Sequence, residues 1–187
     1  MFNKKLIVLS SPSGGGKSTL ANYLMTLYPE IRFSVSCTTR KIREGEIDGK
    51  DYFFLSKGEF EEKVANGEFA EYEQIFGNYY GTLKSEIKKH LNSGNSILFD
   101  VDVKGAVSLR NNFPEDTLLI FIYPPSFEEL KRRLKKRSTE SPEELNTRLE
   151  RAKEELTYKE RFDHAILNDV LQDAFTNLER VIKENLD

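Results

Sequence analysis

Residues 11–19 hold a glycine-rich run followed by a lysine and two hydroxyl side chains, in the order SPSGGGKST. Three consecutive glycines allow backbone N–H groups to converge on phosphate oxygens without side-chain obstruction. Lys17 has the reach to pair with β- and γ-phosphates, and the Ser18 hydroxyl can ligate magnesium. Ser11 stands where such loops usually begin with glycine, so the pattern is matched only in part. The run predicts a nucleoside triphosphate site formed by Ser13, Gly14, Gly15, Gly16, Lys17, Ser18 and Thr19.

A second group of residues could bind a phosphate monoester. Arg40 and Arg43 lie three residues apart, and guanidinium groups pair bidentately with phosphate oxygens. Tyr52 and Tyr80 follow glycines in nearby segments, and each hydroxyl could donate a further hydrogen bond. Taken singly, each of these residues is better explained as a solvated arginine or a half-buried tyrosine. Together they indicate an acceptor site beside the triphosphate loop.

The elements that must position these residues alternate along the chain. Short apolar runs suited to buried strands alternate with helical patterns, which predicts an α/β fold with a mainly parallel sheet. Strands are expected at 6–9, 33–36, 96–101, 118–123 and 164–167. Helices are expected after the first strand and at about 127–134, 145–156 and 171–186. For the helix at 145–156, Ser141 is the expected N-cap, with Pro142 and Glu144 in the first turn.

Residues 37–84 have a different character, rich in glycine, tyrosine, phenylalanine and charge. Ser56 and Glu59 can cap a short helix that ends near Gly67. The stretch 69–76 alternates as a strand and places Glu71 and Glu73 on the same face, so spacing alone does not choose between them. This segment is predicted to form a mixed α+β subdomain inserted into the α/β core.

Composition narrows the class of protein. The chain has 187 residues with a net charge of −3, which disfavours long nucleic acid as a partner. Its one cysteine, Cys37, cannot form an intrachain disulfide, and this favours a reducing compartment. The apolar run at 6–9 is too short for a signal peptide or a membrane span. We therefore expect a cytoplasmic protein without a membrane partner.

The sequence closely resembles the guanylate kinase family over nearly its whole length. The matching segments occur in the family's order and spacing: 11–18, Phe33–Arg43, Gly49–Phe53, Gly77–Thr82, Asp100–Asp102 and Asn168–Asp169. The resemblance implies one domain, with a P-loop kinase core at about 1–36, 85–137 and 157–187, a GMP-binding insert at 37–84, and a helical lid at 138–156. It implies transfer of a phosphoryl group from ATP to GMP with Mg²⁺.

The resemblance also implies how GMP is held. Arg40, Arg43, Tyr52 and Tyr80 would bind its phosphate, and Ser36, Glu71 and Thr82 would bind guanine. A carboxylate can accept from both N1–H and N2–H₂ of guanine, whereas adenine offers neither donor. The resemblance selects Glu71 over Glu73. It places Asp100 and Asp102 near the metal and the guanine end of GMP; capping of the following helix is the alternative for Asp102.

On the ATP side, the resemblance makes Lys17, Arg137 and Arg148 the catalytic cations that neutralise the transferring group. Ser18 would ligate Mg²⁺, with Asp100 behind it. Asn168 would lie near adenine, although a turn role explains this residue nearly as well. We expect dGMP as a further acceptor, and a homodimer is left open.

The alternative functions are a kinase of phosphorylated sugars and an inactive guanylate-kinase-like binding module. The guanine-binding set disfavours the first, and the intact phosphate loop disfavours the second.

Overall fold

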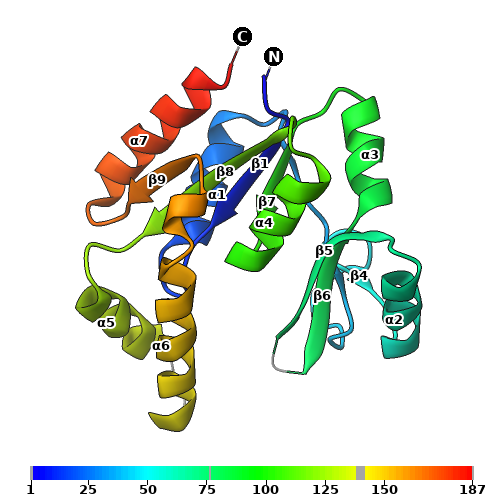
Figure 1. Ribbon diagram of the computed structural model, residues 1–187, viewed down its shortest axis with the longest axis horizontal. Coiled ribbons are helices and arrows are strands. Elements are labelled where there is room, and N and C mark those ends of the chain that lie inside the picture. The colour runs from blue at the N-terminus through cyan, green and yellow to red at the C-terminus, as the bar shows by residue number, and fades with distance from the viewer. Residues whose placement is uncertain (1, 76, 138–141, 187) are drawn as a thin grey trace.

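The computed structural model describes residues 2–75, 77–137 and 142–186 (Figure 1). The central sheet contains β1 (Leu6–Ser10), β2 (Arg32–Phe33), β7 (Ile97–Asp100), β8 (Thr117–Tyr123) and β9 (His164–Leu167). A second sheet contains β3 (Cys37–Thr38), β4 (Phe53–Phe54), β5 (Phe69–Ile75) and β6 (Asn78–Leu83). The helices are α1 (Lys17–Leu27), α2 (Lys57–Ala65), α3 (Lys84–Asn92), α4 (Val103–Asn112), α5 (Phe127–Arg137), α6 (Pro142–Leu156), a 3-10 turn (Lys159–Arg161) and α7 (Leu171–Glu184).

The central sheet has the order β2-β7-β1-β8-β9, and every neighbouring pair is parallel. Alternate side chains of β1 face opposite layers, because side chains in a strand point to alternate faces. Ile7 and Leu9 pack into one cluster with α1 and α7, whereas Leu6 and Val8 pack into another with α4. Figure 1 shows α1 and α7 on one side of the sheet and α4 on the other. The predicted parallel α/β core is confirmed.

The parallel arrangement brings functional segments to one edge of the sheet. The loop at 11–16 follows β1, Asp100 ends β7, and Asn168 follows β9. Leu9 is paired with Asp100 in the register of β1 and β7. Ligand sites in open α/β sheets lie at the carboxyl ends of the strands.

The second sheet has the order β4-β3-β6-β5 and its own apolar cluster, built on Cys37, Phe60 and Phe69. The Phe60 ring stacks on that of Phe69 at a centroid distance of 4.3 Å. Ser56 and Glu59 form the predicted capping box at the start of α2. A register shift between Phe69 and Glu71 leaves Ala70 unpaired, and Ala70 packs in the α4 cluster of the core.

The strand predicted at 33–36 is wrong in position, because β2 covers only Arg32 and Phe33. Beyond it, the Ser34 N–H still donates to the Leu98 carbonyl over 2.9 Å. The chain then leaves the edge of the central sheet and begins the second sheet at Cys37. Sequence alternation cannot show this change of partner.

Helices α5 and α6 pack on each other through a separate apolar cluster of Leu130, Leu134, Leu149 and Ala152. Pro142 is the first residue of α6, as predicted. The predicted N-cap Ser141 lies outside the described residues, as does the side chain of Glu144. In the part of the chain that the structure describes, no helix combines the length and apolarity needed to cross a membrane.

Candidate active site

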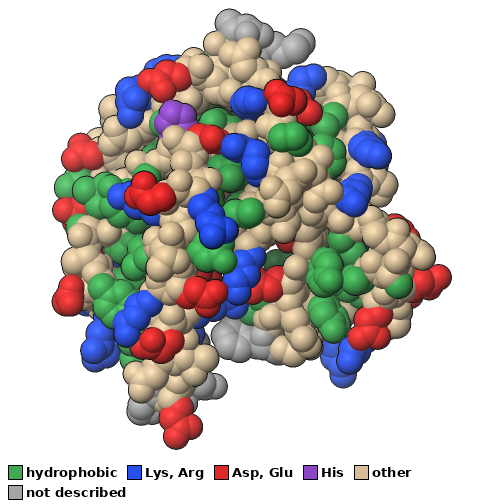
Figure 2. Space-filling model, viewed as in Figure 1, with side chains coloured by type: hydrophobic (Ala, Val, Ile, Leu, Met, Phe, Trp, Pro, Cys, Tyr) green, Lys and Arg blue, Asp and Glu red, His purple; other side chains and the backbone are tan. Residues whose placement is uncertain are grey.

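A cleft of about 470 Å³ opens at the carboxyl edge of the central sheet. The glycine-rich loop lines one wall, and α6 lines another through Arg148, Arg151 and Glu155. Asp102 and Ile75 complete the lining from the side of α4 and β5. Figure 2 shows basic and acidic side chains facing each other in the hollow between α6 and the second sheet. The arrangement suits a polyanionic ligand held by several cationic and N–H groups.

The glycine-rich loop turns sharply into α1. Gly16 is the N-cap of this helix and has a φ of 96°, a backbone conformation that non-glycine residues rarely adopt. The first turn of α1 carries no acidic side chain, so the positive end of the helix dipole is not offset there. A Cβ on Gly15 would lie 2.8 Å from the Cβ of Ser11. The serine side chain at position 11 therefore fits only because residue 15 is a glycine.

Lys17 extends from the first residue of α1 across the end of β7. Its Nζ donates to the Val101 carbonyl over 3.0 Å and forms an ion pair with Asp100. Ser18 follows in the same turn of α1 and is exposed. Nowhere in the described ranges do three or more His, Cys, Asp or Glu side chains gather as metal ligands. The oxygen donors Ser18 and Asp100 suit Mg²⁺, which usually takes one or two protein ligands together with phosphate oxygens.

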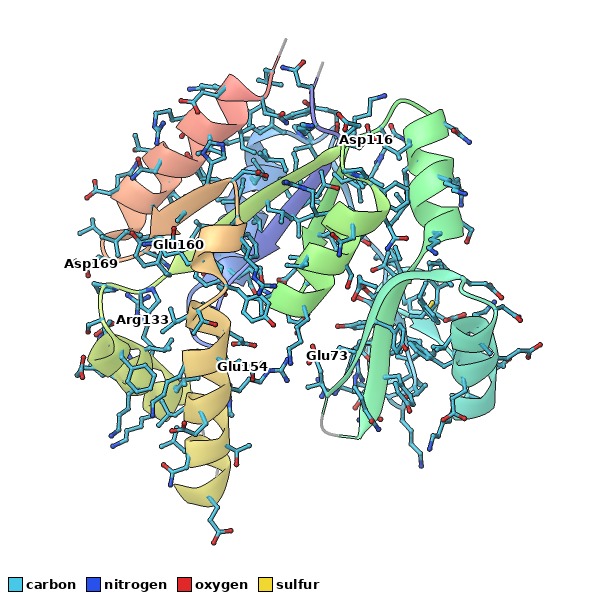
Figure 3. The ribbon with its side chains drawn as sticks, in the orientation of Figure 1. Glu73, Asp116, Arg133, Glu154, Glu160 and Asp169 are labelled. Carbon is cyan, nitrogen blue, oxygen red and sulfur yellow. The ribbon has the colours of Figure 1, made fainter. Side chains whose placement is uncertain are left out.

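Asn168 secures the loop from the end of β9. Its amide Nδ2 donates to the Gly15 carbonyl over 2.8 Å, and a Cβ on Gly16 would lie 2.1 Å from the same nitrogen. Arg133 on α5 donates to the Asn168 carbonyl over 2.9 Å and pairs with Glu129 over 2.7 Å (Figure 3). The Asn168 side chain thus contacts the phosphate loop itself, and its place near adenine stays a prediction.

Glu71 and Thr82 occupy paired positions of β5 and β6. The Thr82 hydroxyl donates to Glu71 Oε1 over 2.6 Å, and Glu71 is 7% exposed. Burial raises the pKa of Glu71 to about 7. Gly105 of α4 faces this carboxylate so closely that a Cβ there would lie 3.0 Å from Glu71 Oε2. The glycine therefore leaves room for a buried acceptor group.

Asp102 performs the capping role that the sequence left as the alternative. Its Oδ1 accepts from the Gly105 N–H over 2.8 Å, at the N-terminus of α4. Its other oxygen, Oδ2, accepts from Arg151 over 3.3 Å. Asp102 is thus both a helix cap and a wall of the cleft.

Three of the four predicted phosphate-binding residues, Arg40, Tyr52 and Tyr80, come together beside the second sheet. The Arg40 guanidinium lies 5.3 Å from the centroid of the Tyr52 ring, and the rings of Tyr52 and Tyr80 are 6.1 Å apart. Glu46 holds Arg40 through two hydrogen bonds of 2.7 and 3.0 Å and accepts from the Arg43 N–H over 2.8 Å. The Arg43 side chain is exposed.

Ser36 and Tyr52 line a smaller pocket of about 200 Å³, together with Asp100. This pocket reaches the end of β7, where Asp100 also pairs with Lys17. The acceptor residues and the phosphate loop therefore meet at Asp100.

Helix α6 presents a polar face to the loop. Arg148 Nη2 donates to the Ser13 hydroxyl over 2.9 Å, and Glu155 Oε2 accepts from the Ser13 N–H over 3.2 Å. Arg151 lies between them on the same face, because residues at i, i+3 and i+7 align along a helix. The side chain of Arg137, also predicted to act here, lies outside the described residues.

Sequence reasoning missed Glu46, Arg151 and Glu155. A signal for the last two was available, since both share the helical face of Arg148. Glu46 lies six residues beyond Arg40 in an irregular segment, and neither helical nor strand periodicity relates the two. The pairing follows from the fold of the loop at 39–51.

The chain is similar to known proteins over most of its length. Residues 3–185 match the family model for guanylate kinase. The chain is 51% identical over 170 residues to a guanylate kinase of Chlorobium luteolum, covering 91% of this chain and 86% of that protein. It is 44% identical over 183 residues to one of Bacteroides fragilis, covering 97% and 90%. The crystal structure of guanylate kinase from Anaplasma phagocytophilum covers 100% of this chain and 89% of its own, with a TM-score of 0.76 at 33% identity.

Proposed function

The chain belongs to the guanylate kinase family, and from that premise we propose that it transfers the terminal phosphoryl group of ATP to GMP, giving ADP and GDP. The observation that carries the proposal is the buried Glu71–Thr82 pair, which lies in the second sheet and is not part of the lining of the cleft at the phosphate loop. A triphosphate loop alone would fit many reactions. A buried carboxylate beside a hydroxyl adds an acceptor site for the donor edge of guanine.

Guanine would be read by hydrogen bonds to three polar groups. The Glu71 carboxylate accepts from N1–H and N2–H₂, both charge-assisted contacts. Thr82 has a single hydroxyl hydrogen, and in the structure Glu71 accepts it. Donation to guanine O6 therefore falls to Ser36, whereas Thr82 offers guanine a lone pair. Adenine in this site would leave the buried Glu71 carboxylate unpaired.

The phosphate of GMP would lie among Arg40, Arg43, Tyr52 and Tyr80. Arg40 is already oriented by Glu46 and by the Tyr52 ring, so little side-chain freedom is lost on binding. Asp100 and Asp102 would border the acceptor from the core. Because GMP contacts in this proposal go to base and phosphate, dGMP is expected to serve as an acceptor too.

The triphosphate of ATP would lie against residues 13–19 at the N-terminus of α1. Lys17 would leave Asp100 and the Val101 carbonyl for the phosphates, and Arg137 and Arg148 would neutralise charge on the transferring group. Ser18 would hold Mg²⁺, with Asp100 close by. When bound, Mg²⁺ supplies positive charge to the phosphate oxygens during transfer. Asn168 would keep the Gly15 peptide oriented so that loop N–H groups face the phosphates.

Three parts of the chain would share this work: a core at about 1–36, 85–137 and 157–187, an insert at 37–84 and a lid at 138–156. The separate apolar clusters of the insert and of α5–α6 support the division. Closure of the insert and lid on the core would align donor and acceptor and exclude water as a competing acceptor. We also propose a cytoplasmic location and a place in purine nucleotide metabolism.

A panel of acceptors tests the proposal. The purified chain with Mg²⁺ and ATP is assayed for ADP formation with GMP, dGMP, AMP, CMP and UMP. We expect GMP to be used best, dGMP next, and the other three far less. Activity on AMP equal to or above that on GMP would exclude the proposed role of Glu71. The same assay without added Mg²⁺ tests the requirement for the metal, and we expect no turnover there.

A further inference from the structure

Arg151 joins three parts of the molecule through carboxylates. Its Nη2 donates to both oxygens of Glu73 over 3.0 and 3.1 Å, and Glu73 lies on β5 of the second sheet. The same nitrogen contacts Asp102 at 3.3 Å, at the start of α4 in the core. Its Nε donates over 3.0 Å to Glu155, one turn along α6. Figure 3 shows Glu73 directed from β5 toward α6.

These contacts engage the Arg151 guanidinium, which lines the same cleft as the glycine-rich loop. Three carboxylates surround one positive charge, and the side chain of Arg151 is 32% exposed, so its contacts are partly shielded from water. Burial and the neighbouring Asp102 raise the pKa of Glu73 to about 8. Moving the guanidinium toward a phosphate would take away the donor that Glu73 and Asp102 share, and would leave both groups partly buried without it, which is costly. We therefore expect Arg151 to keep its carboxylate partners when nucleotides bind.

The same contacts fix the setting of α6 over the phosphate loop. Glu155, held by Arg151, accepts from the Ser13 N–H, and Arg148 on the same face donates to the Ser13 hydroxyl. A rotation of α6 that broke the Arg151 contacts would also move Arg148. Apolar packing of Leu149 and Ala152 on α5 fixes the adjacent face of the helix. Because Arg151 binds Glu73 of the insert and lies on the same helix as Arg148, a movement of the insert would also move Arg148.

Resting on the proposed function, we propose that Arg151 is a positioning residue: by bridging Glu73, Asp102 and Glu155 it sets Arg148 in register with the acceptor on the insert. It acts through its partners and does not touch the transferring phosphoryl group. Arg151 reaches the three carboxyl groups through two donors at fixed positions on one planar group: Nη2 serves Glu73 and Asp102, and Nε serves Glu155. A lysine at this position keeps the charge and can still contact Glu73 and Asp102, but it lacks the second fixed donor that holds Glu155.

The proposal is tested with Arg151→Lys, Glu73→Gln and the double variant. We expect Arg151→Lys to lower kcat about 10- to 100-fold, because small misplacements of reacting groups have effects of that size. GMP and a non-hydrolysable ATP analogue, titrated separately, should each bind within about threefold of the parent. The analogue titrated in the presence of GMP should lose the gain in affinity that the parent shows, since the link between insert and lid is broken.

The double variant separates positioning from direct contact. If Arg151 acts through Glu73, Glu73→Gln alone lowers kcat, and the double variant is no slower than Arg151→Lys. If the two substitutions instead lower kcat by factors that multiply in the double variant, the proposal is overturned. A raised KM for ATP with unchanged kcat in Arg151→Lys would also overturn it, in favour of a direct phosphate contact. Full kcat in Arg151→Lys would overturn it as well.

Arg180→Lys is the matched control, because Arg180 pairs with Glu184 on the exposed face of α7. It should leave kcat and both affinities unchanged, and melting temperatures of all variants report whether the fold is kept. A parent chain inactive toward GMP would instead refute the proposed function. Parent activity that survives intact in Arg151→Lys would refute only the role of Arg151.

Discussion

The Thr82 hydroxyl lies 2.6 Å from the Glu71 carboxylate, at directly paired positions of β6 and β5. Glu73, two residues along the same strand, pairs instead with Arg151 from α6. Two glutamates on one face of a strand therefore have different partners. Glu71 is buried against α4 beside a hydroxyl, whereas Glu73 belongs to the contacts between insert and lid.

Glu71→Gln should lower kcat/KM for GMP about 30- to 1000-fold, equivalent to roughly 2–4 kcal/mol. One acceptor oxygen becomes an NH₂ donor that faces a donor on guanine. Activity on AMP should fall less or rise, so discrimination between GMP and AMP narrows. Steady-state kinetics with both acceptors measure this. Glu73→Gln is the matched comparison and should leave the GMP-to-AMP ratio nearly unchanged; a narrowed ratio there instead would mean that Glu73 reads the base.

Stability should depend on pH through Glu71. Its pKa is raised from 4.5 to about 7 by burial, so the native state holds this proton more tightly than the unfolded state. Ionising Glu71 therefore destabilises the fold as pH rises from about 4.5 to 7. Relative to Glu71→Gln, the parent should lose roughly 2–3 kcal/mol between pH 5 and pH 8. Urea denaturation of both proteins at the two pH values measures it, and parallel stability profiles would contradict the raised pKa.

Lys17→Ala should reduce turnover about 10²- to 10⁴-fold, because the transferring phosphoryl group loses a cation. The fold should survive, since the lysine pairs with Asp100 at the partly exposed edge of the cleft. Turnover and melting temperature are measured together. Lys183→Ala, on the exposed face of α7, is the control and should keep full activity. Near-parental turnover in Lys17→Ala would remove Lys17 from the proposed machinery.

Arg40→Ala should weaken GMP binding more than Arg43→Ala does, by about 10- to 100-fold against about 3- to 10-fold. Arg40 is held in place by Glu46, whereas the exposed Arg43 side chain must be ordered when the phosphate binds. Calorimetric titration of GMP and of an ATP analogue tests both variants. ATP binding should change little, and a greater loss for the ATP analogue than for GMP would place this pair on the donor side.

Asn168→Asp should weaken binding of an ATP analogue about tenfold while leaving GMP binding intact. The substitution replaces the amide donor with a carboxylate oxygen facing the Gly15 carbonyl, so a hydrogen bond becomes a repulsive contact. Asn185→Asp is the matched control, because Asn185 Nδ2 donates to the Lys4 carbonyl over 2.9 Å at the chain ends. It should affect stability only. Equal loss of ATP affinity in both variants would show a general effect on the fold.

Local chemistry made much of this protein predictable from its sequence. Apolar runs located β1, β7, β8 and β9 to within one residue at each end, and the capping box of α2 was visible as Ser56 and Glu59. The phosphate loop could be found because its glycines, lysine and hydroxyls are neighbours in the chain. These features depend on backbone conformation and side-chain spacing within a few residues, which sequence order records directly.

Tertiary structure alone decided which distant groups meet. Gly15 and Asn168 are 153 positions apart, and Glu73 and Arg151 are 78 apart, yet both pairs are in hydrogen-bond contact. No periodic pattern in the sequence could reveal either contact, because each depends on sheet order and on the packing of α5 and α6. The early end of β2 has the same origin, since the chain leaves one sheet to join another. The chemical groups and their local elements therefore follow from the order of the residues, whereas strand order and helix packing select their partners.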